Sequence, residues 1–250
     1  MARGRSHARY YRLRRRGRLM LALGVLGTAL VAGVCYLAGP NLPAGARLLG
    51  APLGSGSAEQ ITVLADWPLT LVNEAHPLPK GFAVDVEEIE NLQRFDRRAA
   101  GELRRMLADA RRQGLQPLVC SGYRSVTRQQ QLYDEQVGVE RDAGHDEVQA
   151  MAVAKTKVAL PGASEHNLGL AADIVAVDYQ ELKADYENTP ECQWLMAHAA
   201  EYGFILRYPK DKVEITGIQY EPWHYRYVGK NAAKEIVQMG VCLEEYLQNK

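Results

Sequence analysis

Two histidines and two carboxylates in the second half of the chain have the side-chain types of a catalytic metal site. His166 and Asp173 lie in the stretch SEHNLGLAAD, and Glu221 and His224 lie in EPWHYRYVG. The residues between Asn167 and Asp173 are small and apolar. This composition predicts that Asp173 is carried into the core, where an unpaired charge is costly. A partner for its carboxylate is therefore expected beside it.

His166, Asp173 and His224 together would offer a divalent metal two nitrogen ligands and one oxygen ligand. Three protein ligands leave one tetrahedral position open, which is typical of a catalytic rather than a structural zinc site. Such a site also needs a carboxylate that does not bind the metal and that moves the proton of a water molecule. Glu221 is the natural candidate, because the proline after it favours an extended conformation beside His224, and Glu165 is a rival. Spacing alone leaves open that each histidine is an ordinary surface or core residue, since no short helical pair such as HExxH is present.

Three motifs resemble those of one enzyme family. SGYRS, PGASEHNLGLAADI and YEPWHYRYVG begin at residues 121, 161 and 220. Their order and approximate separations resemble those of the VanY-type D-alanyl-D-alanine carboxypeptidases, which are zinc metallopeptidases of the LAS group. The family pattern SxHxxGxAxD is met from Ser164 to Asp173, and the pattern ExxH is met at Glu221 and His224. The resemblance extends over about residues 69–247 and implies the LAS/hedgehog-like metallopeptidase fold.

The resemblance implies roles for five residues. Zinc would be held by His166, Asp173 and His224. Glu221 would act as general base and then as general acid. Arg124 of SGYRS would contact the substrate near the scissile carbonyl, where a guanidinium can stabilise the developing oxyanion. Without the motif, a structural salt bridge would be the simpler interpretation of Arg124.

Five further residues are candidate substrate contacts, with simpler alternatives for some of them. Ser121, Gln129 and Ser164 could bind polar groups of the substrate. Tyr220 and Trp223 could wall a pocket for a D-alanine methyl group. The alternatives are a solvated helix face for Gln129 and core packing for the two aromatic residues.

The resemblance implies zinc-dependent removal of the C-terminal D-alanine from peptidoglycan stem peptides or from their lipid-linked precursors. Related sequences share the metal motifs, so an L,D-carboxypeptidase acting on tetrapeptide stems and a D,D-endopeptidase acting on cross-links are alternatives. A non-catalytic wall-binding module of the same fold is a further alternative, and the presence of Glu221 argues against it. A membrane-anchored protein with a role in interactions only is disfavoured by the three motifs.

Charge and hydropathy divide the chain into an N-terminal targeting region and a folded domain. Eight arginines and no acidic residue precede residue 39, which leaves 22 basic against 30 acidic residues and gives no reason to expect a nucleic-acid partner. Residues 1–18 are expected to be a cytoplasmic tail. Residues 19–38 are uncharged and are expected to be a transmembrane helix, since twenty helical residues span about 30 Å. A cleaved signal peptide, with a site at Ala44–Ala46, is the alternative. In both cases the catalytic domain is expected outside the cytoplasm of a bacterial cell, at the membrane.

Residues 39–60 have the composition of a flexible linker, and residues 61–250 are expected to form one α+β domain. Its sheet is expected to be central and mainly antiparallel, with helices flanking it. Apolar spacing predicts helices over 95–112, 125–137, 146–160 and 190–202, and two short helices at the end. Short apolar runs predict strands over 117–120, 170–177, 204–206 and 225–228. Cys120, Cys192 and Cys242 are an odd number, so they cannot all pair within the domain, and one disulfide is left open.

Overall fold

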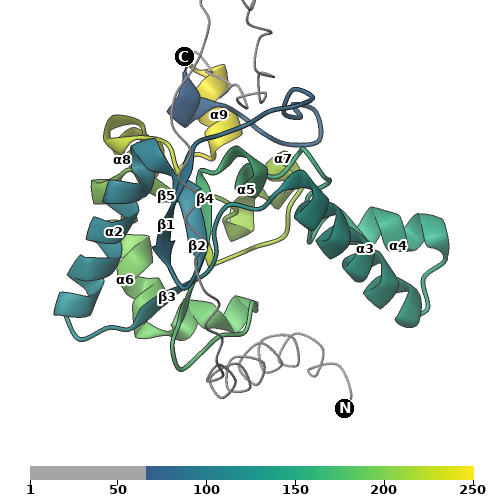
Figure 1. The fold of residues 1–250 in the computed structure, drawn as a ribbon, viewed down its shortest axis with the longest axis horizontal. Helices are drawn as coiled ribbons and strands as arrows, with labels where there is room; N and C mark the ends of the chain where they lie inside the picture. Colours follow the sequence, from purple (N-terminus) through teal and green to yellow (C-terminus); the bar gives the residue numbers. More distant parts are fainter. Residues whose placement is uncertain (1–65) are drawn as a thin grey trace, which may run out of the picture. The chain divides into compact units, whose positions relative to one another are not determined.

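The computed structural model describes residues 66–250, which build a central four-stranded sheet with helices around it (Figure 1). The strands lie in the order β3–β4–β6–β5. They comprise Pro117–Ser121, Ala171–Ala176, His224–Tyr227 and Phe204–Leu206. All three pairings are antiparallel, so the predicted α+β class with an antiparallel central sheet is confirmed.

Part of the predicted organisation lies outside the described residues. The expected tail (1–18), transmembrane helix (19–38) and linker (39–60) all precede residue 66. Among residues 66–250, no helix combines the length and the apolar character needed to cross a bilayer. The three cysteines of this part of the chain are free: Cys120, Cys192 and Cys242.

Helix α2 (Arg97–Arg112) supplies one side of the main core. The Asp96 side chain caps its first turn by accepting a hydrogen bond from the Arg98 backbone N–H (2.9 Å). Its apolar face is buried, as the spacing predicts, at Ala99, Leu103, Met106, Leu107 and Ala110. The helix begins two residues later than predicted because Phe95 belongs to a strand.

The other helices are α3 (Val126–Asp142), α4 (Glu147–Ala154), α5 (Glu165–Leu168), α6 (Pro190–His198), α7 (Val213–Thr216), α8 (Lys230–Met239) and α9 (Leu243–Gln248), with 3-10 turns η1 (Trp67–Leu69), η2 (Ala184–Asn188), η3 (Ala199–Tyr202) and η4 (Lys210–Lys212). Of these helices, α3, α4, α6, α8 and α9 follow the predicted order with different bounds, whereas the single-turn helices α5 and α7 were not predicted. The pair α3–α4 extends away from the sheet, while α2 and α6 lie beside it (Figure 1). The predicted helix 146–160 ends early, at Ala154, and the predicted helix 190–202 divides into α6 and η3.

Sequence patterns gave no sign of a two-stranded hairpin, β1 (Val86–Glu90) and β2 (Gln93–Asp96). Its turn is formed by Asn91 and Leu92, with φ of 51° and 64°. Asn-Gly is the usual signal for a turn with both residues in this region, and leucine at the second position hides it. The hairpin supports the SGYRS loop, since the Arg94 carbonyl accepts a hydrogen bond from the Tyr123 N–H (2.6 Å).

Replacing Leu103 by alanine is expected to lower the free energy of unfolding by about 2–5 kcal/mol, because truncation of a fully buried side chain leaves a cavity. Leu103 is 0% exposed in the cluster that also holds Val119 and Phe204. Urea denaturation measures the change. The control is Val148→Ala on α4, where the side chain is 77% exposed. The control should change stability by no more than about 0.5 kcal/mol. Equal stabilities of the two variants would contradict the packing of α2 against the sheet.

Candidate metal centre

The register of the central sheet brings two of the predicted ligands together. Asp173 in β4 pairs directly with His224 in β6, and on its other side with Ser121 in β3. Side chains of directly opposed residues lie on the same face of a sheet, with Cβ atoms about 5 Å apart. The pairing therefore places the carboxylate and the imidazole side by side.

His166 reaches the same place from helix α5, which precedes β4. The Ser164 hydroxyl caps this helix by accepting a hydrogen bond from the His166 backbone N–H (3.3 Å). Gly169 ends it in the left-handed conformation, with φ of 85°, which glycine adopts without strain. The chain then enters β4 at Ala171. A single turn of helix therefore separates the first ligand from the strand that carries the second.

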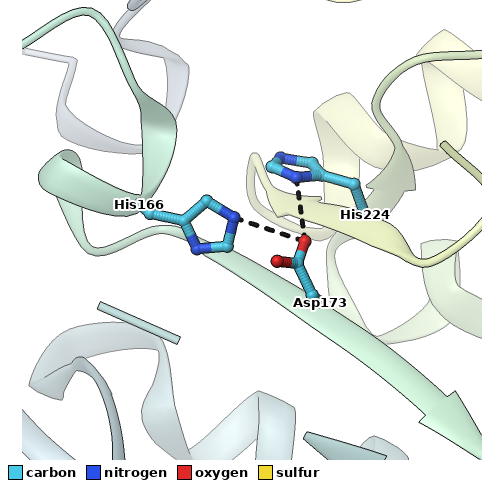
Figure 2. Close-up of side chains that lie close together, drawn as sticks. All are labelled: His166, Asp173 and His224. Atoms are coloured by element: carbon cyan, nitrogen blue, oxygen red, sulfur yellow. Dashed lines mark hydrogen bonds and ion pairs between the residues drawn. The ribbon is translucent and has the colours of Figure 1, made fainter. Parts of the chain in front are cut away.

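Figure 2 shows one oxygen of the Asp173 carboxylate facing a nitrogen of each imidazole ring. This oxygen, Oδ1, lies 3.3 Å from His166 Nε2 and 3.1 Å from His224 Nδ1. The three residues are buried, and their potential ligand atoms lie within 4.8 Å of one another. Tetrahedral zinc with bonds of about 2.0–2.2 Å sets its ligands roughly 3.3 Å apart. The spacing around Asp173 Oδ1 therefore fits one zinc ion.

Each imidazole ring has a hydrogen-bond acceptor at its outer nitrogen, which is the ring nitrogen that does not face Asp173. His166 Nδ1 lies 2.8 Å from the Gly122 carbonyl oxygen, and His224 Nε2 lies 3.4 Å from Glu165 Oε2. A proton on each outer nitrogen leaves a lone pair on the inner nitrogen, where a metal ion can bind. The residues present thus fit zinc both in spacing and in the tautomers that their partners favour.

Glu165, the rival base, lies behind His224. Its Oε1 accepts hydrogen bonds from Arg207 Nε and Arg226 Nη1, both at 2.7 Å. Burial alone would raise the pKa of Glu165, but Arg207 and Arg226 hold that pKa well below its usual range. A carboxylate held ionised in this way is a poor proton acceptor. Its position is suited to orienting His224. Neither arginine stood out in the sequence, where both are ordinary charged residues beside an apolar stretch.

Glu221 lies beside the inner nitrogen of His224, with Oε2 3.6 Å from His224 Nδ1. Burial raises the pKa of Glu221 to about 8, and Asp173 adds to the rise, while His224 and Arg124 oppose it. A carboxyl group that titrates in this range can accept and return a proton near neutral pH. Its position and its raised pKa suit the predicted role of general base.

Arg124 lies at the edge of the same group of residues. Its Nη2 donates to Asp173 Oδ2 (2.5 Å) and lies 3.0 Å from His166 Nε2. Ser121 Oγ accepts from Nε (2.7 Å), and Gln129 Oε1 accepts from Nη1 (3.2 Å). The guanidinium is therefore fixed beside the candidate ligands by three side chains. Arg124 makes the structural ion pair with Asp173, and its contact with substrate stays a prediction.

The two aromatic candidates have partners within the protein. The Tyr220 hydroxyl donates to Glu187 (2.9 Å). Trp223 packs against a buried cluster that includes Val175 and Tyr186. A contact with substrate stays a prediction for the whole set: Ser121, Gln129, Ser164, Tyr220 and Trp223.

Residues 92–230 match the family described as VanY, D-alanyl-D-alanine carboxypeptidase. A D-alanyl-D-alanine carboxypeptidase of Enterococcus faecalis is 44% identical over 182 residues, which cover 73% of this chain. The chain spans 66% of that relative, just under two thirds of its length.

Solved structures resemble the chain as well. A mutant of the vancomycin resistance D,D-pentapeptidase VanY from a VanB-type cassette, in complex with Zn(II), is 45% identical, with a TM-score of 0.66 over 72% of this chain and 99% of that one. The LD-carboxypeptidase LdcB is 38% identical, with a TM-score of 0.60 over 71% of this chain and 84% of that one.

Replacing Gly122 by alanine is expected to weaken zinc binding by about 10–100-fold, the usual effect of losing a partner behind a metal ligand. A Cβ at this position would lie 2.3 Å from the Arg94 carbonyl oxygen, so the loop must move. The Gly122 carbonyl would then leave His166 Nδ1. Competition with a chelator measures the zinc affinity.

The matched control is Gly138→Ala in α3, where an added Cβ meets nothing within 4 Å. This variant should bind zinc as the parent protein does, and it should be more stable by up to about 1 kcal/mol because alanine favours a helix interior. Unchanged zinc affinity in a folded Gly122→Ala protein would contradict the role of the Gly122 carbonyl.

Proposed function

Because the chain belongs to the VanY family of D-alanyl-D-alanine carboxypeptidases, we propose that it is a zinc-dependent D,D-carboxypeptidase that removes the C-terminal D-alanine from peptidoglycan stem peptides. The observation that carries the proposal is the buried group His166, Asp173 and His224, with the Glu221 carboxylate 3.6 Å from His224 Nδ1. Three ligands and a separate proton acceptor are what hydrolysis at a zinc site requires.

Zinc would be held by His166 Nε2, Asp173 Oδ1 and His224 Nδ1. The ion, when bound there, supplies a Lewis acid that polarises the scissile carbonyl and lowers the pKa of water. The protein supplies the rest of the chemistry through its own side chains. Gly122 and Glu165 keep the two rings oriented, at 2.8 and 3.4 Å from their outer nitrogens.

Glu221 is the proton carrier of the proposed reaction. It takes a proton from the attacking water and returns it to the nitrogen of the departing D-alanine. Burial, which raises the pKa of Glu221 to about 8, stabilises the protonated carboxyl between these two transfers. The same residue therefore serves as base and then as acid.

Arg124 stabilises the oxyanion that develops at the scissile carbonyl. Its guanidinium donates to Ser121, Gln129 and Asp173 and carries a further N–H group on Nη1. A donor that is already fixed in place needs no reorganisation when charge develops, which is the main source of such stabilisation.

An L,D-carboxypeptidase is the second candidate, because the LD-carboxypeptidase LdcB is 38% identical to this chain over the matched part. The D,D assignment is favoured by the higher identities of 44% and 45% to the D,D-acting relatives. The two activities differ in the stem that is cut. A D,D-carboxypeptidase shortens pentapeptides, and an L,D-carboxypeptidase shortens tetrapeptides.

We further propose that the catalytic domain lies outside the cytoplasm, held at the membrane by residues 19–38. The support is the run of arginines before this uncharged apolar segment, because positive charge favours the cytoplasmic side. The proposed substrate, the wall precursor, is exposed on the outer side of the same membrane.

Incubation with defined stem peptides separates the two candidates. The purified protein is expected to release one D-alanine from a pentapeptide stem and to leave the tetrapeptide product intact, as read by mass spectrometry. A chelator should abolish the release, and added zinc should restore it. Shortening of the tetrapeptide alone would replace the D,D assignment by the L,D one.

Glu221→Gln is expected to keep its zinc and to lower kcat by about 10²–10⁴-fold, since the amide cannot take a proton. Zinc content and turnover are measured on the same preparation. Glu214→Gln, at an exposed position of α7, is the control and should retain full activity. Undiminished turnover of Glu221→Gln would remove the assigned base.

A further inference from the structure

The acceptor behind His224 belongs to a buried ion network that reaches the last described helix, α9. Glu165 Oε1 accepts from Arg207 Nε at 2.7 Å. Arg207 in turn donates from Nη1 and Nη2 to Glu244 of α9, at 2.8 and 2.6 Å. An unbroken line of contacts therefore runs from Glu244 through Arg207 and Glu165 to the ring of His224.

The network is buried throughout. Arg207 and Glu165 are each 1% exposed, and Glu244 is 7% exposed. A guanidinium that meets a carboxylate through two parallel hydrogen bonds has its plane fixed as well as its position. Glu244 thus determines where the third donor of Arg207, Nε, is aimed, and that donor meets Glu165.

A second arginine makes the charge balance of the network sensitive to Glu244. Arg226 Nη1 donates to Glu165 Oε1, the same oxygen that Arg207 contacts (both 2.7 Å). Two guanidinium groups therefore stand against two carboxylates. Without the charge of Glu244, Glu165 would be the carboxylate that faces both arginines, and its interaction with His224 would compete with both.

Packing explains how a residue so late in the chain reaches the network. Leu243 and Tyr246 of α9 lie in one apolar cluster with Ile205 of β5 and Ile236 of α8. Arg207 follows β5 directly. The burial of the apolar side of α9 therefore carries Glu244 to the end of that strand.

The neighbouring glutamate, Glu245, makes different contacts. Glu245 accepts a hydrogen bond from the Cys242 backbone N–H (2.8 Å) and pairs with Lys212 (3.0 Å). These contacts hold the start of α9 and do not involve the arginines. Glu244 and Glu245 thus form a matched pair on one helix, one inside the network and one outside it.

We propose that Glu244 is a positioning residue of the metal centre: through Arg207 it fixes Glu165, and through Glu165 it fixes the orientation in which His224 presents Nδ1. The inference rests on the proposed zinc site. It makes α9 a part of that site, although the helix contributes no ligand and no group that touches substrate.

The test compares zinc binding in the full chain with and without the Glu244 charge. Glu244→Gln keeps the size of the side chain and removes its charge and one acceptor. Zinc affinity is measured by competition with a chelator, and ligand geometry by the visible spectrum of the cobalt-substituted protein. We expect zinc binding to weaken by about tenfold, which is the lower end of the usual effect of losing a residue that supports a metal ligand. We also expect the absorption bands of the cobalt-substituted protein to shift.

Glu245→Gln is the matched control. It should lower thermal stability through α9 while zinc affinity stays within about twofold of the parent protein and the cobalt spectrum is unchanged. Glu244→Asp, which keeps the charge, should lie between the parent protein and Glu244→Gln. If Glu244→Gln does not fold, Glu244→Asp is measured by the same criterion, and a weaker zinc affinity than that of Glu245→Gln is expected.

The inference is overturned if the Glu244 variant that is measured matches Glu245→Gln in zinc affinity and in cobalt spectrum. A loss of thermal stability alone would then assign Glu244 to holding α9. The parent protein separates this failure from that of the proposed function. A parent chain that binds no zinc overturns both, whereas a parent that binds zinc beside an unaffected variant overturns this inference only.

Discussion

A carboxylate in the middle strand of a sheet needs compensating charge and hydrogen bonds, and Asp173 is such a carboxylate. It is 2% exposed. Burial alone would raise the pKa of Asp173, but the neighbouring His166, Arg124 and His224 hold that pKa well below its usual range. An ionised group of this kind cannot be left unpaired. The two imidazoles and the guanidinium must therefore be in place in the folded protein, and their arrangement is the geometry of a metal site.

The surrounding structure can be understood as successive supports for that arrangement. His166 and His224 each have an acceptor on the outer side, the Gly122 carbonyl and the Glu165 carboxylate. Behind Glu165 lie two arginines, and behind one of them lies Glu244. From Glu165 outward, through the arginines to Glu244, the charges alternate in sign. These groups come from elements far apart in the sequence. The antiparallel register of the sheet and the apolar packing of α9 bring them together.

Local patterns in the sequence were sufficient to predict features that depend on the spacing of residues within a short stretch of the chain. The apolar face of α2 follows from helical spacing, and the candidate metal ligands follow from motifs. The β1–β2 hairpin was missed because Leu92 fills a turn position that usually carries glycine. The helix expected to reach residue 160 was too long because apolar residues after α4 pack without helical structure. Glu244 and Glu245 are identical and adjacent, and only tertiary packing decides which one is buried.

The most direct test of the central claim is to locate zinc in crystals of the metal-loaded protein by anomalous diffraction at the zinc absorption edge. The geometry around Asp173 predicts one peak about 2.0–2.2 Å from His166 Nε2, His224 Nδ1 and one Asp173 oxygen. The choice of nitrogen differs between the two rings because their outer partners differ. A peak elsewhere, or rings that present the opposite nitrogens to the ion, would contradict the assignment of these residues as the metal centre.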